Sequence, residues 1–138
     1  MTNPNTTIKQ VLIVRKDLNM RKGKMTAQGS HASMAPLFGR DKAQVHANDN
    51  GTFTLSFTLT ADEYHWFNIL SAKIVVGVNS EAELMEVYNK AVAMNLPVAL
   101  IQDAGLTEFG GVKTYTAVGI GPVQAHLVDQ ITGHLTLL

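Results

Sequence analysis

The first residues that could do chemistry are a lysine, a glutamine and a histidine at helical spacing. Lys24, Gln28 and His31 lie four and three positions apart, so in a helix they share one face. They would offer a cation, an amide and a group that exchanges protons near neutral pH. A solvated helix face has the same spacing, and both interpretations stay open. A Ser-His-Asp triad is less attractive, because neighbours such as Ser30 and His31 point about 100° apart on a helix.

A second feature is the Gln-Asp-Ala-Gly sequence at residues 102–105. Asp103 follows the apolar run 98–101, which is typical of a buried strand. In open α/β sheets, sites form beyond the carboxyl ends of strands, where a reactive carboxylate is expected. An aspartate before a glycine is also common in ordinary turns. If both features are functional, they form opposite walls of one crevice, with Lys24 and His31 facing Asp103.

The elements that must position these residues predict an α/β fold. We expect a single domain over residues 1–138, with a mixed, mostly parallel sheet of about four strands and helices on both faces. The predicted strands are 11–14, 74–78, 98–101 and 114–118, and the predicted helices are 24–38, 60–70 and a stretch from Ser80 to before Asn95. The strand–helix–strand unit from 74 to 101 predicts parallel pairing with a right-handed crossover.

Other segments have simpler predictions. Residues 1–8 are expected to be flexible, and 39–50 to form a loop with a turn at its end. The strict alternation over 52–60 predicts a half-buried strand, a candidate fifth strand of the sheet. The Gly119-Ile120-Gly121-Pro122 sequence would end the last strand and start a short helix. Its glycines either permit the bend or offer N–H groups to a phosphate.

Composition excludes several classes of protein. The chain has no cysteine, so disulfides and thiolate chemistry are excluded, and its five histidines lack zinc-motif spacing. The net charge is zero, but residues 1–42 hold eight Lys or Arg against two Asp, so positive charge gathers between Arg15 and Lys24. Such a patch attracts phosphates, although many basic runs are only solvated surface. No segment is long and apolar enough to span a membrane, and we expect a cytoplasmic protein.

Several motifs, in order, resemble the type 2 peptidyl-tRNA hydrolase family. They are Arg21-Lys22-Gly23-Lys24, Ala27-Gln28-Gly29-Ser30-His31-Ala32, Leu100-Ile101-Gln102-Asp103-Ala104-Gly105, Thr116 with Gly119-Ile120-Gly121-Pro122, and Asp129 with Thr132-Gly133-His134-Leu135. The resemblance covers most of residues 9–38 and 66–138. It implies an α/β enzyme, usually a homodimer, that cleaves the ester joining a peptide to the terminal ribose of tRNA, without cofactor or metal.

The resemblance also implies the site. Carried over by position, the catalytic cluster is Lys24, His31, Asp103, Thr107 and Thr116, with Gln28 beside it; Arg21, Lys22, Lys16, Gly119 and Gly121 are the further candidates for contacts with substrate or tRNA. We expect Asp103 or His31 to orient and deprotonate water, the threonines to position it, and Lys24 or a backbone N–H to stabilise the oxyanion.

The chain departs from the family pattern in four places. Leu106 stands where the family usually has an arginine, the loop from Glu108 to Tyr115 is one residue longer, Val123-Gln124 replaces the usual Gly-Pro, and residues 39–65 do not match. Two alternatives therefore stay open. One is a binding module for RNA or protein that keeps the fold, and the other is a hydrolase of another acyl ester.

Overall fold

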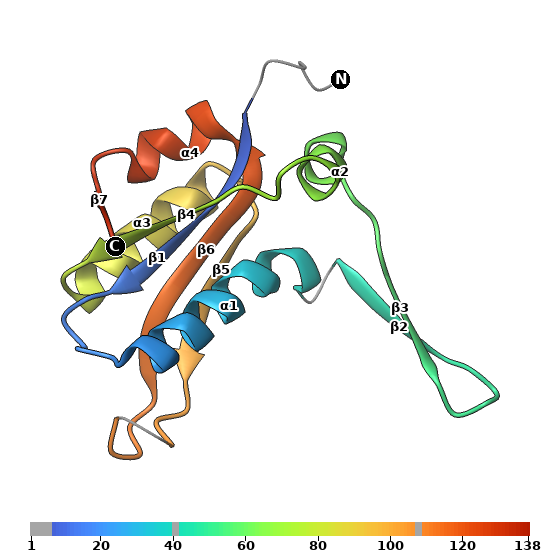
Figure 1. The fold of residues 1–138 in the computed structure, drawn as a ribbon, viewed down its shortest axis with the longest axis horizontal. Helices are drawn as coiled ribbons and strands as arrows, with labels where there is room; N and C mark the ends of the chain where they lie inside the picture. Colours follow the sequence, from blue (N-terminus) through green and yellow to red (C-terminus); the bar gives the residue numbers. More distant parts are fainter. Residues whose placement is uncertain (1–6, 40–41, 107–108) are drawn as a thin grey trace.

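The computed structural model describes residues 7–39, 42–106 and 109–138, and a five-stranded mixed sheet forms its centre (Figure 1). Its strands are β1 (Ile8–Arg15), β4 (Lys73–Val78), β5 (Val98–Asp103), β6 (Thr114–Gln124) and β7 (Thr136–Leu137), in the order β5-β6-β1-β4-β7. β1, β4 and β5 run in one direction, and β6 and β7 in the other. The predicted α/β class with a mixed sheet is confirmed, and β7 is an additional strand.

Two predictions about the strands need correction. The strand–helix–strand unit does not pair, because β1 and β6 lie between β4 and β5; only β1 and β4 form a parallel pair. The flexible start predicted for residues 1–8 extends too far, since Ile8 is already buried in β1. Residues 1–6 lie outside the described part of the chain.

Helices cover both faces of the sheet, as predicted. α1 (Lys22–Phe38) packs on one face, where Leu12 and Val14 point, and α3 (Glu81–Ala93) and α4 (Ala125–Thr132) pack on the other. β1 is therefore buried on both faces, which explains its continuous apolar run. Figure 1 shows α1 in front of the sheet, with α3 and α4 behind it. None of the helices in the described ranges is long and apolar enough to cross a bilayer.

Local signals correctly predicted two helix starts. Thr60 and Glu63 form a reciprocal capping box at the start of α2 (Ala61–Asn68), and Ser80 caps α3 by accepting a hydrogen bond from the Glu83 N–H. Trp66 in α2 is 4% exposed and donates from Nε1 to the Ala72 carbonyl. It is a core residue, as predicted.

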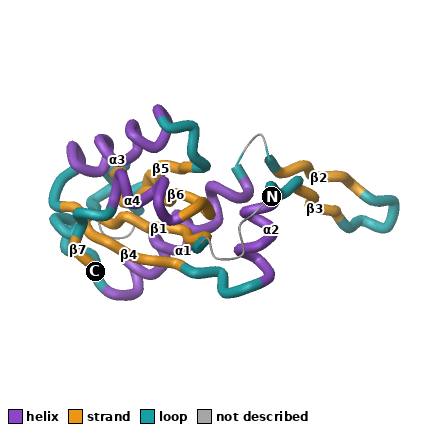
Figure 2. Tube along the Cα trace, turned by 90° about the horizontal axis from the view of Figure 1, so that it is seen from above, coloured by secondary structure: helices purple, strands orange, loops and turns teal. Residues whose placement is uncertain are grey.

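The alternating segment forms a strand, but it does not join the main sheet. β3 (Phe53–Phe57) pairs in antiparallel fashion with β2 (Ala43–Ala47) in a separate two-stranded sheet. β2 lies within the predicted loop 39–50, where the sequence AQVHA gives no strong strand signal by itself. Both strands are largely exposed rather than half-buried. Figures 1 and 2 show the hairpin extending away from the rest of the molecule.

The turn and helix start predicted at residues 119–122 are wrong, because β6 continues to Gln124 and α4 begins at Ala125. The glycines here serve close packing. A Cβ on Gly119 would lie 1.8 Å from the Ala32 carbonyl oxygen of α1. Gly121 has a φ of +103°, and its Cβ would lie 2.7 Å from the Lys9 carbonyl oxygen. Tertiary contact thus determines both glycines, and neither lies at a helix N-terminus.

We expect Gly119→Ala to lower the free energy of unfolding by about 1–3 kcal/mol, because the new methyl group must displace the backbone of α1. Gly29→Ala is the control, since a Cβ there meets nothing within 4 Å and alanine favours the helix by roughly 0.5–1 kcal/mol. Urea denaturation of both variants measures the difference. Equal stabilities would contradict the close packing of α1 on β6.

Candidate active site

The candidate site lies where the start of α1 meets the end of β5. Asp103, the last residue of β5, accepts a hydrogen bond from the Lys24 Nζ at 2.6 Å. Only 13% of the Lys24 side chain and 12% of the Asp103 side chain are exposed. Such a short charged pair, shielded from most of the solvent, holds both groups in one geometry. The structure thus brings the lysine-rich turn and the Gln-Asp-Ala-Gly loop into direct contact.

Gln28 joins this ion pair to the interior of the sheet. Its Nε2 lies 3.4 Å from the same Asp103 oxygen, and its Oε1 accepts a hydrogen bond of 2.5 Å from the Thr116 hydroxyl. Gln28 is 3% exposed and Thr116 is fully buried. Because the threonine hydroxyl donates to Oε1, the amide is oriented with its NH₂ toward the carboxylate. We call Lys24, Gln28, Asp103 and Thr116 the Asp103 cluster.

The second carboxylate oxygen of Asp103 is held by the backbone. The Gly105 N–H donates to it at 2.8 Å. Gly105 has a φ of +81°, and a Cβ on it would lie 2.3 Å from the Val112 carbonyl oxygen. Glycine is therefore required for this turn. Both oxygens of Asp103 are fixed, one by side chains and one by the main chain.

Asp103 is a stable carboxylate. The hydrogen bond from the Lys24 ammonium is the largest cause that lowers the pKa of Asp103 below its ordinary value; burial opposes this, and the Gly105 N–H and the charges of Lys24 and His31 lower the pKa further. At neutral pH the group is therefore ionised. An aspartate of low pKa is well suited to orienting water and stabilising a neighbouring positive charge, but it is a weak proton acceptor.

His31 lies on α1 seven residues after Lys24 and is exposed. It is near enough for its charge to act on Asp103. The two serines of the weaker triad hypothesis have structural partners, since Ser30 donates to the Thr26 carbonyl and Ser33 donates to Gln10. Both serine hydroxyls thus donate to groups within the fold, whereas His31 is exposed on the same helix.

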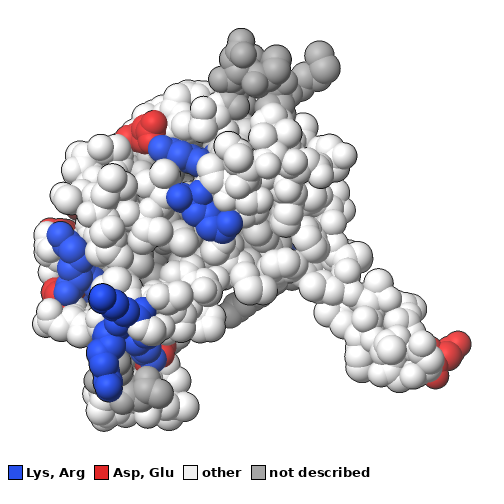
Figure 3. Space-filling model, in the orientation of Figure 1, with Lys and Arg blue, Asp and Glu red and all other residues white. Residues whose placement is uncertain are grey.

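The other predicted residues do not all gather at the cluster. Arg21 and Lys22 are exposed at the start of α1, where Figure 3 shows blue Lys and Arg side chains together on the surface. Lys16 is also exposed, but its side chain lies over Gly77 of β4. Gly119 and Gly121 are buried in β6. Thr107 lies outside the described residues.

Sequence reasoning missed Phe109. Its ring centroid lies 5.5 Å from the Lys24 Nζ, which is within the range of a cation–π interaction. Phe109 also packs against the core on the α1 side of the sheet. The available signal was a large aromatic residue in a glycine-rich loop. Among the described residues, no three His, Asp or Glu side chains are grouped so that they could hold a metal ion.

Comparison with known proteins identifies the family of the chain. The family model described as "Peptidyl-tRNA hydrolase PTH2" matches residues 8–138. Proteins named peptidyl-tRNA hydrolase from Methanocaldococcus jannaschii, Staphylothermus marinus and Sulfurisphaera tokodaii are each 40% identical to the chain; the matches cover 95%, 97% and 94% of it and 100%, 98% and 98% of those proteins. A solved structure of a protein of unknown function from Agrobacterium shares the fold, with a TM-score of 0.54, 10% identity and coverage of 94% of this chain and 96% of that one. The chain belongs to the peptidyl-tRNA hydrolase PTH2 family.

Proposed function

We propose that the chain hydrolyses the ester between a peptide, or an N-blocked amino acid, and the terminal ribose of tRNA. The observation that carries the proposal is the buried Lys24–Asp103 pair with exposed His31 beside it, in a chain of this family. Ester hydrolysis requires an oriented water, stabilisation of the tetrahedral oxyanion and a proton for the leaving hydroxyl. The groups around Asp103 can supply all three.

Because the pKa of Asp103 is lowered, chiefly by the Lys24 hydrogen bond, we assign the orientation of water to Asp103 and the acceptance of the proton to His31. Asp103 orients the water, and His31 accepts the proton as the water oxygen attacks the ester carbon. When the carbon–oxygen bond to the ribose breaks, His31 returns the proton to the ribose oxygen. Lys24 is the cation nearest to this chemistry and stabilises the oxyanion.

We propose another role for Thr116 than direct contact with the water, because its hydroxyl is fully buried and donates to Gln28. We assign it as a positioning residue that fixes the amide of Gln28 through their hydrogen bond. Gln28 in turn orients Asp103. Thr107 keeps its proposed role in holding the water.

Exposed positive charge at the start of α1 supports tRNA as the substrate. Arg21 and Lys22 precede Lys24 at the start of α1 and are exposed, and lysine and arginine side chains bind nucleic-acid phosphates. We assign Arg21 and Lys22 to phosphate contacts beside the cluster, and we keep Lys16, whose side chain lies over Gly77, as a candidate contact from the family resemblance alone. We also propose, from the family resemblance, that the protein acts as a homodimer in the cytoplasm.

The test is release of an N-acetylated amino acid from N-acetyl-aminoacyl-tRNA by the purified chain. We expect release that slows steeply as salt rises, because phosphate contacts release counterions. The control substrate is the same N-acetylated amino acid esterified to a small alcohol. Fast, salt-independent cleavage of that ester would favour another acyl substrate. Salt-sensitive binding of tRNA without release would identify a binding module instead.

A further inference from the structure

The β2–β3 hairpin, residues 43–57, has one apolar and one polar face; we call it the arm. The cross-strand pairs Ala43–Phe57, Val45–Leu55 and Ala47–Phe53 share one face, and the pairs Gln44–Ser56 and His46–Thr54 share the other. Along the arm, every side chain of the first face is therefore apolar. A hairpin that contacted only water would not need one face made of apolar side chains.

The apolar face of the arm is largely uncovered. Val45 is 68% exposed, Phe53 70% and Leu55 52%, and the arm extends away from the sheet and helices in both views (Figures 1 and 2). A lone two-stranded hairpin is marginally stable in water, and contiguous exposed apolar surface marks an interaction site. The arm therefore needs a partner surface.

The base of the arm is fixed to the rest of the molecule. The ring of Phe57 packs edge-on against Phe38, with centroids 4.9 Å apart, and lies 6.2 Å from Phe67 of α2. Lys42 pairs with the buried Glu63 at 3.0 Å. These contacts hold the arm in one direction, so binding through it costs less conformational entropy than binding through a flexible loop.

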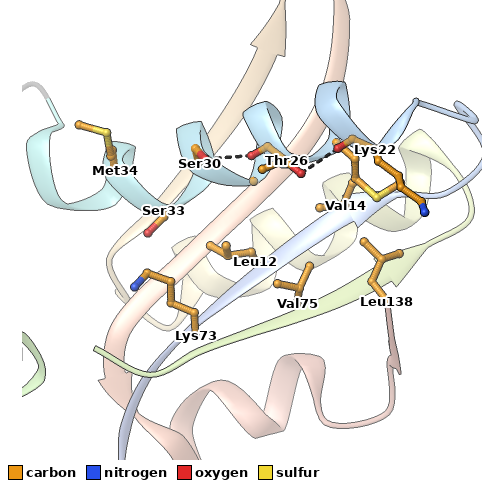
Figure 4. A pocket seen from close by; sticks show the side chains of 12 residues that line it. Leu12, Val14, Lys22, Thr26, Ser30, Ser33, Met34, Lys73, Val75 and Leu138 are labelled. Carbon is orange, nitrogen blue, oxygen red and sulfur yellow. Dashed lines mark hydrogen bonds between the residues drawn. The ribbon is translucent and has the colours of Figure 1, made fainter. Parts of the chain in front are cut away.

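The chain also has an apolar groove of about 670 Å³ between α1 and β4. Figure 4 shows α1 on one side, β4 on the other and Leu12 on the floor. The apolar lining comes from Leu12, Val14, Met25, Met34, Val75 and Leu138. The flexible thioethers of Met25 and Met34 suit an interface that must adapt to a partner.

The charges of the two surfaces are complementary. Within the arm the only Lys, Arg, Asp or Glu is Asp49, at the turn, where Figure 3 shows red atoms at the tip. Lys22 and Lys73 line the groove at its two ends (Figure 4). Because the arm has no Lys or Arg, it offers no cation to bind nucleic-acid phosphates. Its apolar face can instead pack on the apolar lining of the groove, with its acidic tip near one of the two lysines.

We propose that the arm of one copy lies in the α1–β4 groove of a second copy, and the reverse. In a two-fold dimer each contact occurs twice, so one association covers both arms and both grooves. Two such contacts also bring the buried area closer to the roughly 800 Å² per partner of a stable interface. This inference rests on the proposed homodimer, and its tests below use readouts other than hydrolysis.

The first measurement is the mass in solution by analytical ultracentrifugation. Wild type should have twice the 15.0 kDa mass of one chain. The double variant Val45→Ser/Leu55→Ser should weaken association by at least about 100-fold, because losing one central apolar side chain weakens an interface about 30-fold and the symmetry repeats the loss. The control Gln44→Ser/Thr54→Ser changes the polar face of the same strands and should stay dimeric. A monomeric wild type, or equal weakening in both variants, would overturn the proposal.

The second measurement identifies what the arm touches. Because the chain has no cysteine, two single variants, Leu55→Cys in the arm and Met34→Cys in the groove, can be mixed and oxidised. We expect a disulfide-linked dimer in the mixture and none in either variant alone. Linkage of Leu55→Cys to itself would show that arms pair with arms. A dimeric protein without linkage in the mixture, repeated with Met25→Cys, would overturn the arm–groove contact and leave both the homodimer and the hydrolysis proposals standing.

Discussion

Asp103→Asn is expected to lower kcat for N-acetyl-aminoacyl-tRNA by at least about 100-fold, within the usual range for removing a group from proton-transfer chemistry. Asparagine keeps the size of the side chain, but its single oxygen can accept from only one side, either from Lys24 or from the Gly105 N–H, which now donate to different oxygens of Asp103. The change therefore removes the negative charge and one of the two acceptor oxygens. Without that charge, the water that Asp103 orients loses a strong acceptor.

The matched control for this experiment is Asp129→Asn. Asp129 also pairs with a lysine, since the Lys9 Nζ lies 2.7 Å from its Oδ1, but half of its side chain is exposed and it lies on α4. We expect this variant to keep wild-type turnover. The measurement is single-turnover release with both variants checked for folding by circular dichroism. A folded Asp103→Asn protein with wild-type turnover would remove Asp103 from the mechanism.

Much of the candidate site could be predicted because its signals are local. Helical spacing places Lys24 and Gln28 on one side of α1, and the end of an apolar run places Asp103 at the edge of the sheet. Asp103 Oδ1 lies 2.6 Å from the Lys24 Nζ and 3.4 Å from the Gln28 Nε2. Both contacts follow once α1 begins near Lys24, β5 ends at Asp103 and the two elements lie side by side. Burial of Thr116 did not follow from these signals, because it depends on how α1 lies across β6.

The errors arose where distant parts of the chain meet. Gly119 and Gly121 read as turn residues by composition, yet they allow close approach of α1 and β1 to a continuous strand. β2 has little strand signal of its own, and it forms because β3 pairs with it. The position of Phe109 beside Lys24 likewise depends on the path of a loop. These contacts join residues far apart in the chain, so they leave no regular spacing in the local sequence from which they could be predicted.

Lys24→Met is expected to reduce turnover at neutral pH by about 100-fold, the lower end of the loss seen when a group that stabilises an oxyanion is removed. It should also change the pH dependence. In the wild type, the Lys24 hydrogen bond is the main cause that lowers the pKa of Asp103, against the effect of burial. Without Lys24, burial acts with less opposition, so the pKa of Asp103 rises and the acid limb of the kcat/KM profile moves to higher pH.

The same pKa shift determines how stability depends on pH. A carboxyl whose pKa is lowered by folding stabilises the protein above its unfolded pKa, and this contribution is lost as pH falls through the folded pKa. The stability difference between wild type and Lys24→Met should therefore be largest near neutral pH and shrink in acid. Urea denaturation from neutral to acidic pH measures it, with Lys90→Met as the control, because Lys90 pairs with Glu86 on the exposed surface of α3 at 3.0 Å. A pH-independent difference, together with an unmoved acid limb, would show that Lys24 does not set the ionisation of Asp103.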